Sequence, residues 1–137
     1  MAKVVTNLPE FNRQVKAFAK ANPTRVLVIQ QKLMLDAFER LVSYTPRKLG
    51  YLAWNWQPTP GKPADEAIGE LGKRYPLPGT DRAVRVNAVL KPFEKSWITN
   101  NAVYAVRIND GWASYAGAQM LERTVNDLLF SNFGITS

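Results

Sequence analysis

Apolar residues near the start of the chain recur at helical spacing. Leu8, Phe11, Val15 and Phe18 lie three or four residues apart. Asn7 and Glu10 resemble a capping box, so the pattern predicts a first helix from there to Asn22-Pro23. Basic residues fall on the opposite face of this helix: Arg13, Lys16 and Lys20.

A second and longer helix is predicted over residues 24–44, where the polar residues form one narrow stripe. That stripe contains Lys32, Asp36, Glu39 and Ser43. The remaining arc is apolar and wider than a helix on one side of a small core requires. The surplus positions, Val28, Leu35 and Val42, therefore need a further partner. It could be the first helix, a sheet, or a neighbouring subunit, and we take these three as candidate subunit contacts.

The rest of the chain predicts shorter elements. Residues 52–56 alternate as a strand does, with Leu52, Trp54 and Trp56 on one face. A third helix is predicted from Thr80-Asp81 to Pro92, although the alternation over residues 84–90 also permits a strand. A short strand over 96–99 and a brief helical or extended piece over 104–108 follow. The third helix is expected to bury Ala83, Val86, Val89 and Leu90. A last helix over 118–131 is expected to bury Leu121, Val125, Leu128 and Leu129.

Prolines and glycines concentrate between the predicted strand and the third helix. Residues 58–79 predict an extended Pro-rich arm or loop on the surface. We therefore expect one α+β domain over residues 1–137. In it, long N-terminal helices and two shorter helices pack on a small antiparallel sheet.

The chain contains neither cysteine nor histidine. Disulfides, thiolate zinc sites, Cys nucleophiles and Ser-His-Asp triads are thereby excluded. The acidic cluster Asp65, Glu66 and Glu70 is the one group that could imitate a catalytic or metal-binding pair, and its position in the Pro-rich segment favours a solvated face. We expect no enzymatic activity, no catalytic residue, no metal and no cofactor. A cell-wall hydrolase that uses these three carboxylates is the enzymatic alternative.

The net charge is +7, and residues 1–32 hold six basic residues against one acidic residue. Such an excess indicates an anionic neighbour, either nucleic acid or an acidic protein surface, unless it only solubilises the helix. No apolar run is long enough to cross a membrane, and residues 1–7 are too short and polar for a secretory signal. We therefore expect synthesis in the cytoplasm and neither a membrane partner nor a small-molecule ligand.

The tryptophans allow two interpretations. Exposed aromatics beside cations can stack on single-stranded nucleic acid, but Trp54 and Trp56 share a face with Leu52, which favours burial. Trp112 follows Gly111 in a polar stretch and is the better candidate for a subunit-interface anchor.

Two segments together resemble the tail-completion (neck) proteins of lambda-like long-tailed bacteriophages. The first combines Thr45-Pro46, Gly50 and Trp56, and the second combines Asn101, Tyr104-Ala105 and Gly111. The similarity covers roughly residues 25–130, with departures such as Asn109 where the family has Glu. These motif residues are structural: helix stops, tight turns and buried rings.

The resemblance implies a structural subunit of a ring, typically a hexamer, at the head–tail junction of the virion. Such a ring is assembled in the host cytoplasm, contacts the tail terminator or tail tube and the head–tail connector, and forms part of the DNA conduit. DNA or an acidic partner would then face Arg13, Lys16, Lys20, Arg47 and Lys48. The alternatives are a tail terminator or other minor tail protein, and a small basic nucleic-acid-binding phage protein.

Overall fold

The computed structural model describes residues 13–14, 16–17, 20–47, 49–112 and 115–133. Along the chain its elements are α2 (Pro23–Tyr44), α3 (Tyr51–Trp54), β1 (Trp56–Pro60), α4 (Asp81–Val89), β2 (Ser96–Asn100), α5 (Ala105–Asp110), β3 (Gly111–Trp112), β4 (Tyr115–Ala116) and α6 (Met120–Phe133). β1 pairs with β2, and β3 pairs with β4, both antiparallel.

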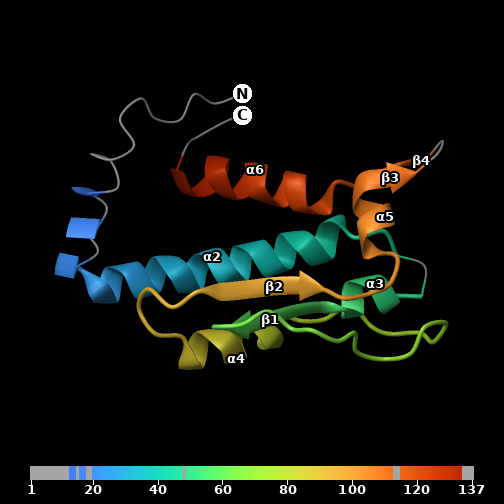
Figure 1. Ribbon diagram of the computed structural model, residues 1–137, viewed down its shortest axis with the longest axis horizontal. Coiled ribbons are helices and arrows are strands. Elements are labelled where there is room, and N and C mark those ends of the chain that lie inside the picture. Colours follow the sequence, from blue (N-terminus) through green and yellow to red (C-terminus); the bar gives the residue numbers. More distant parts are fainter. Residues whose placement is uncertain (1–12, 15, 18–19, 48, 113–114, 134–137) are drawn as a thin grey trace.

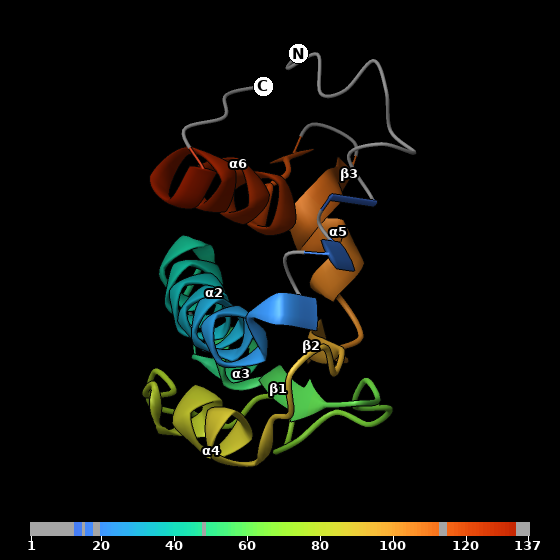
Figure 2. The ribbon, with the colours of Figure 1, turned by 90° about the vertical axis from the view of Figure 1, so that its left-hand side faces the viewer.

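Helix α2 is the centre of the fold (Figure 1). Helix α6 runs along one side of it, and the β1–β2 sheet and α4 lie on the other side (Figure 2). The length of α2 is expected from its sequence, because Pro23 occupies the first helical turn and Thr45, before Pro46, leaves the helical conformation.

The β1–β2 sheet has one core face and one face covered by the following loop. The register pairs Trp56 with Asn100 and Pro58 with Ile98, so alternate residues of both strands face α2. Trp56 is buried and Ile98 packs against the core. On the outer face, the Gln57 amide donates to the Glu66 carbonyl (2.8 Å) and the Trp97 indole donates to the Gly61 carbonyl (3.1 Å).

The core gathers apolar side chains from nearly every element. Its members are Met34, Phe38, Leu41, Val42, Tyr51, Leu52, Trp56, Ala83, Val86, Ala102, Ala105 and Met120. The prediction of a small α+β domain with a long N-terminal helix is confirmed.

Helical residues at 13–14, 16–17 and 20–21 belong to the predicted first helix, which Asn22 separates from α2. The apolar stripe of that helix, Leu8, Phe11, Val15 and Phe18, lies outside the described residues.

Most of the predicted short elements are found in the structure, and where the sequence permitted either a helix or a strand the structure shows which one forms. The third helix is a helix, Asp81–Val89, and the piece near residue 104 is the helix Ala105–Asp110. The strand near residue 96 is Ser96–Asn100. The Pro-rich segment divides: Pro58 and Pro60 belong to β1, and residues 61–80 form a long loop.

The strand predicted over residues 52–56 is wrong. Residues 51–54 form the short helix α3, which begins because Gly50 adopts a left-handed conformation (φ 87°). The Trp54 N–H then donates to the Gly50 carbonyl (2.9 Å). Leu52 and Trp56 are buried in the core while Trp54 is half-buried, so the three do not form one strand face.

The inward face predicted for the last helix is wrong at Leu121 and Val125, whereas Leu128 and Leu129 are half-buried. Leu121 and Val125 are 48% and 53% exposed, whereas Met120 and Thr124 are buried. Polar contacts between α6 and α2, described below, set the rotation of α6 and turn Leu121 and Val125 outward. Val89 of α4 is likewise exposed rather than inward.

Candidate interaction surfaces

The acidic residues of the Pro-rich segment show no catalytic arrangement. Asp65 and Glu66 are exposed, and Glu70 forms an exposed ion pair with Lys73 (2.8 Å). Within the described ranges, no group of three or more acidic, His or Cys side chains could hold a metal ion. None of the described helices combines the length and apolarity that crossing a membrane requires.

A buried pair explains why Thr45 and Trp56 occur together. The Thr45 hydroxyl donates to the Leu41 carbonyl (2.5 Å) and accepts a hydrogen bond from the Trp56 indole N–H (2.7 Å). Both side chains are buried, so these bonds satisfy polar atoms that water cannot reach. The Thr-Pro end of α2 is thereby fixed to the first residue of the sheet.

The region around Gly50 is closed by Tyr75, which comes from the loop. The Tyr75 N–H donates to the Leu49 carbonyl (2.8 Å), and its ring stacks on Trp54 with centroids 5.2 Å apart. Tyr51 contacts both Tyr75 and Tyr104, with ring centroids 6.2 Å apart in each case. Burial raises the pKa of the Tyr104 phenol.

Three amide side chains hold the loop over residues 61–80 against the domain. Asn55 binds both backbone groups of Ile68: its Nδ2 donates to the carbonyl (3.0 Å) and its Oδ1 accepts the N–H (2.8 Å). The amides of Gln57 and Asn101 donate to the carbonyl of Glu66. The segment is therefore a docked loop, and Asn101 of the family-like motif is one of its attachments.

Arg82 of α4 performs a similar structural role at the start of β1. Its guanidinium donates to the carbonyls of Trp54 and Trp56 and lies over the Trp54 ring, 4.2 Å from the centroid. Burial lowers the pKa of Arg82, but an arginine remains charged at any physiological pH. This arginine therefore fixes the chain between α3 and β1.

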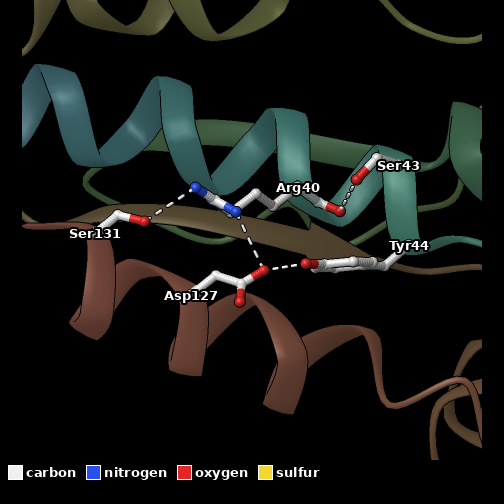
Figure 3. Close-up of polar contacts among 5 residues, drawn as sticks. All are labelled: Arg40, Ser43, Tyr44, Asp127 and Ser131. Atoms are coloured by element: carbon white, nitrogen blue, oxygen red, sulfur yellow. Dashed lines mark hydrogen bonds and ion pairs between the residues drawn. The ribbon is translucent and has the colours of Figure 1, made fainter. Parts of the chain in front are cut away.

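A cluster of polar residues, which we term the helix clasp, joins α2 to α6 (Figure 3). The Asp127 carboxylate of α6 accepts hydrogen bonds from Arg40 (3.1 Å) and from the Tyr44 hydroxyl of α2. Arg40 also donates to Ser131 (3.2 Å), and the Arg123 guanidinium lies over the Tyr44 ring, 3.9 Å from its centroid. The clasp places the polar residue Asp127 on the side of α6 that faces α2.

We predict that Asp127→Asn lowers the free energy of unfolding by about 1 kcal/mol, because it weakens two hydrogen bonds of a charged group. Arg40 and Asp127 are each 34% exposed, which limits the effect through solvent screening. Glu70→Gln is the control, because its ion pair with Lys73 is more exposed and should contribute no more than about 0.5 kcal/mol. Denaturant unfolding would compare the two variants, and equal losses would contradict the clasp.

The clasp also predicts a loss of stability at high pH. The hydrogen bond to Asp127, with burial and the Asp127 charge, raises the pKa of Tyr44 above its ordinary value of 10.0. The folded state then holds this proton more tightly than the unfolded state. This contribution is complete below pH 10.0 and is lost as the pH rises through the higher folded pKa. In unfolding experiments, the stability advantage of wild type over Tyr44→Phe should shrink only above about pH 10, and an advantage that falls already near neutral pH would refute the assignment.

Asn109 was missed as a site residue by sequence reasoning. It is buried; its Oδ1 accepts the Leu121 N–H (3.0 Å) and its Nδ2 donates to Glu122 (2.7 Å). Gly117 lies against the same backbone, where a Cβ would come within 3.0 Å of the Asn109 carbonyl oxygen. These contacts fix the start of α6 on the end of α5. The one sequence signal was that Asn109 departs from the family pattern.

Large apolar side chains are exposed at both ends of the long axis of the molecule. At one end, which we call the α4 end, they come from the N-terminal half of α2, from α4 and from the turn before β2 (Figure 1). These are Val28, Val84, Val89 and Phe93. At the other, the α5 end, they come from α5, the residues before it and the start of α6. These are Val103, Val106, Leu121 and Val125. Large apolar side chains that are left exposed on neighbouring elements mark candidate interaction surfaces.

Comparison of the chain with protein families, with curated proteins and with solved structures found no match.

The candidate subunit contacts divide between surface and core. Val28 is 58% exposed, Leu35 is partly buried against the core, and Val42 is part of the core. Val42 is thus removed as a subunit contact, because the sheet side of its own chain already covers it. Trp112 lies in strand β3, and its side chain is outside the described residues.

The predicted basic face is exposed where the structure describes it. Arg13, Lys16 and Lys20 are exposed helical residues, and Arg47 is exposed just after α2. Lys48 lies outside the described residues. The four described cations are thus accessible to an anionic partner.

The remaining motif residues are structural. Ala105 is buried at the start of α5, and Gly111 ends that helix at φ 90°. Pro46 is exposed directly after the buried Thr45.

Proposed function

We propose that the chain is a structural subunit of a ring at the neck of a tailed bacteriophage, where it joins the tail to the head. The observation that carries the proposal is the pair of exposed apolar surfaces at opposite ends of one small domain. A two-fold dimer uses a single self-complementary surface, whereas two different surfaces suit head-to-tail contacts that can close into a ring. The resemblance of the two motif segments to neck proteins supplies the place of the ring in the virion.

The design of the domain agrees with a structural role. Its polar side chains are used to join elements: Thr45 to Trp56, Asn55 to the loop, and Asp127 to α2. The pKa changes of Tyr44, Tyr104 and Arg82 arise from these internal contacts or from burial. A tail terminator or another minor tail protein would use the same kind of surfaces and is the neighbouring alternative.

A phage with a stop codon in this gene tests the proposal. We expect filled heads and separate tails that do not join, no infectious particles, and full rescue when the chain is supplied from a plasmid. Purified wild-type particles should contain the chain in a small fixed number of copies. Infectious particles that lack the chain would refute a structural role in the virion.

The side chains of Arg13, Lys16 and Lys20 are exposed, which agrees with a ring that attracts either the DNA in its channel or an acidic surface of the adjacent ring. We predict that replacing all three by Glu leaves the fold intact, because the residues are exposed, but reduces infectivity of the complemented particles at least tenfold. Infectivity equal to wild type would remove this assignment. Tight, salt-sensitive DNA binding by the isolated chain would favour a nucleic-acid-binding protein instead.

A further inference from the structure

The turn before β2 presents an aromatic ring to solvent. Phe93 adopts a left-handed backbone conformation (φ 69°) and is 55% exposed. A bulky residue in this conformation is uncommon, and such strain persists only where the surroundings enforce it. Because the ring is not buried in its own domain, the core gains little from a phenylalanine here.

The surroundings hold this turn from two sides. The Gln30 side chain of α2 accepts the Phe93 N–H (3.0 Å) and donates to the Glu94 carbonyl (2.9 Å). Within the turn, the Lys91 N–H donates to the Glu94 carboxylate, and the Glu94 N–H donates to the Lys91 carbonyl (both 3.1 Å). The backbone is therefore fixed while the ring of Phe93 protrudes. A preorganised aromatic residue is suited to act as an anchor in an interface.

A pocket of about 350 Å³ lies at the α5 end, between β2, α5 and α6. Trp56 and Met120 are buried and form its inner part, while Ile98, Val106 and Leu121 line it nearer the surface. This volume is at the lower limit for small-molecule sites and is sufficient for one aromatic side chain. The apolar lining matches the ring of Phe93.

The charges around the two features are complementary. Lys91 and Lys95 flank Phe93, and both are exposed. The one carboxylate of this turn, Glu94, accepts the Lys91 N–H, so the turn keeps an excess of one positive charge. Asp110 is the only charged residue among the described residues that line the pocket. Asn109 joins Asp110 to Glu122, which places a second carboxylate beside it. Basic flanks around an aromatic anchor and carboxylates beside an apolar pocket favour one orientation of contact.

We propose that Phe93 of one copy inserts into the α5-end pocket of the next copy. This inference rests on the proposed function, since it names the contact that builds the ring. The turn and the pocket lie toward opposite ends of the long axis, as the positions of β2 and α5 in Figure 1 show, so the contact is head-to-tail. Each copy then offers one anchor and one pocket, which is the requirement for a closed ring.

Cysteine cross-linking tests the contact directly, because the chain contains no cysteine of its own. The double variant Lys95→Cys with Val106→Cys keeps Phe93 in place and puts one thiol beside the anchor and one at the edge of the pocket. On oxidation it should give a ladder of dimers, trimers and higher species, since each copy can be linked on both sides. Each single variant should give at most dimers. The matched control combines Lys95→Cys with Phe130→Cys, because Phe130 lies farther along α6, is exposed, and does not line the pocket.

A second variant separates assembly from folding. Asn adopts the left-handed conformation more readily than Phe, so Phe93→Asn should not lower the melting temperature. It should weaken self-association of the full chain at least tenfold in sedimentation experiments. Leu71→Asn is the control, since it removes a comparably exposed apolar side chain from the loop and should leave association within about twofold of wild type.

The outcomes separate this contact from the proposed function. Wild-type rings whose cysteine variants give no ladder, or a Phe93→Asn variant that associates like wild type, would overturn the contact and leave the neck subunit standing. A wild-type chain that stays monomeric at every concentration would also overturn the contact between copies. The stop-codon experiment decides the neck function independently of these results.

Discussion

Gly50→Ala should destabilise the domain by about 3–5 kcal/mol, among the largest effects expected of a single methyl group. The first reason is the left-handed backbone, φ 87°, which costs a residue with a Cβ roughly 1–2 kcal/mol. The second is steric: a Cβ at Gly50 would come within 3.0 Å of the Tyr75 carbonyl oxygen, a backbone atom that cannot rotate away. The Tyr75-to-Leu49 hydrogen bond and the start of α3 would both be disturbed.

Gly72 provides a matched control for the steric part. Its φ is 89°, nearly that of Gly50, but a Cβ there would meet nothing within 4 Å. Gly72→Ala should therefore cost only the conformational term of about 1 kcal/mol. Denaturant unfolding gives both values, and equal losses would show that Tyr75 does not close over Gly50 as described.

Thr45→Val should cost about 2–3 kcal/mol, because it leaves the buried indole N–H of Trp56 without its partner. Trp56→Phe removes both the N–H and part of the ring, and it should cost a similar amount through the cavity that it creates. In the Trp56→Phe background, Thr45→Val should cost about 1 kcal/mol less, because no indole is left unpaired. A double-mutant cycle measures this coupling.

Thr124→Val is the control for the threonine change. Thr124 is buried, and its hydroxyl has no hydrogen-bond partner among the described residues. The same replacement should therefore be neutral or slightly stabilising there. A loss at Thr124 as large as that at Thr45, or additive effects in the cycle, would contradict the Thr45–Trp56 bond.

The sequence predicted the elements whose causes are local. Helix α2 was predicted nearly to the residue, since Pro23 begins it, Thr45-Pro46 ends it, and a single polar stripe runs between them. The α+β class followed from the same kind of local signal. The strand predicted over 96–99 is found as Ser96–Asn100. After Thr80 the local pattern favoured a helix but also permitted a strand, and the segment is the helix Asp81–Val89.

The failures concern elements whose causes lie far away in the sequence. Residues 52–56 alternate like a strand, but the chain turns into α3 because Tyr75 packs over Gly50 from a distance of 25 positions. The apolar residues of α6 recur at helical spacing, and from this spacing alone they were predicted to face the core. The actual rotation of α6 is set by Asp127, which binds Arg40 and Tyr44 more than 80 positions earlier.

The candidate sites show the same division. The exposed basic face of residues 13–20 could be predicted, because charge pattern alone defines it. The exposed position of the Phe93 ring could not be predicted. It depends on a hydrogen bond to Gln30 of α2 and on a left-handed backbone conformation at a residue that is not glycine. The surplus apolar width of α2 left two kinds of partner open, one within the chain and one in a neighbouring subunit. At Val42 the partner is the core of its own chain, so the subunit contact is wrong there.

Native mass spectrometry of the purified full chain tests the central claim most directly. If the two apolar ends join copies head-to-tail into a closed ring, one oligomer of fixed copy number should appear as the concentration rises, with no larger species beyond it. Six copies are expected from the resemblance to neck proteins. An open-ended series of ever larger oligomers, or a chain that remains monomeric throughout, would contradict the ring.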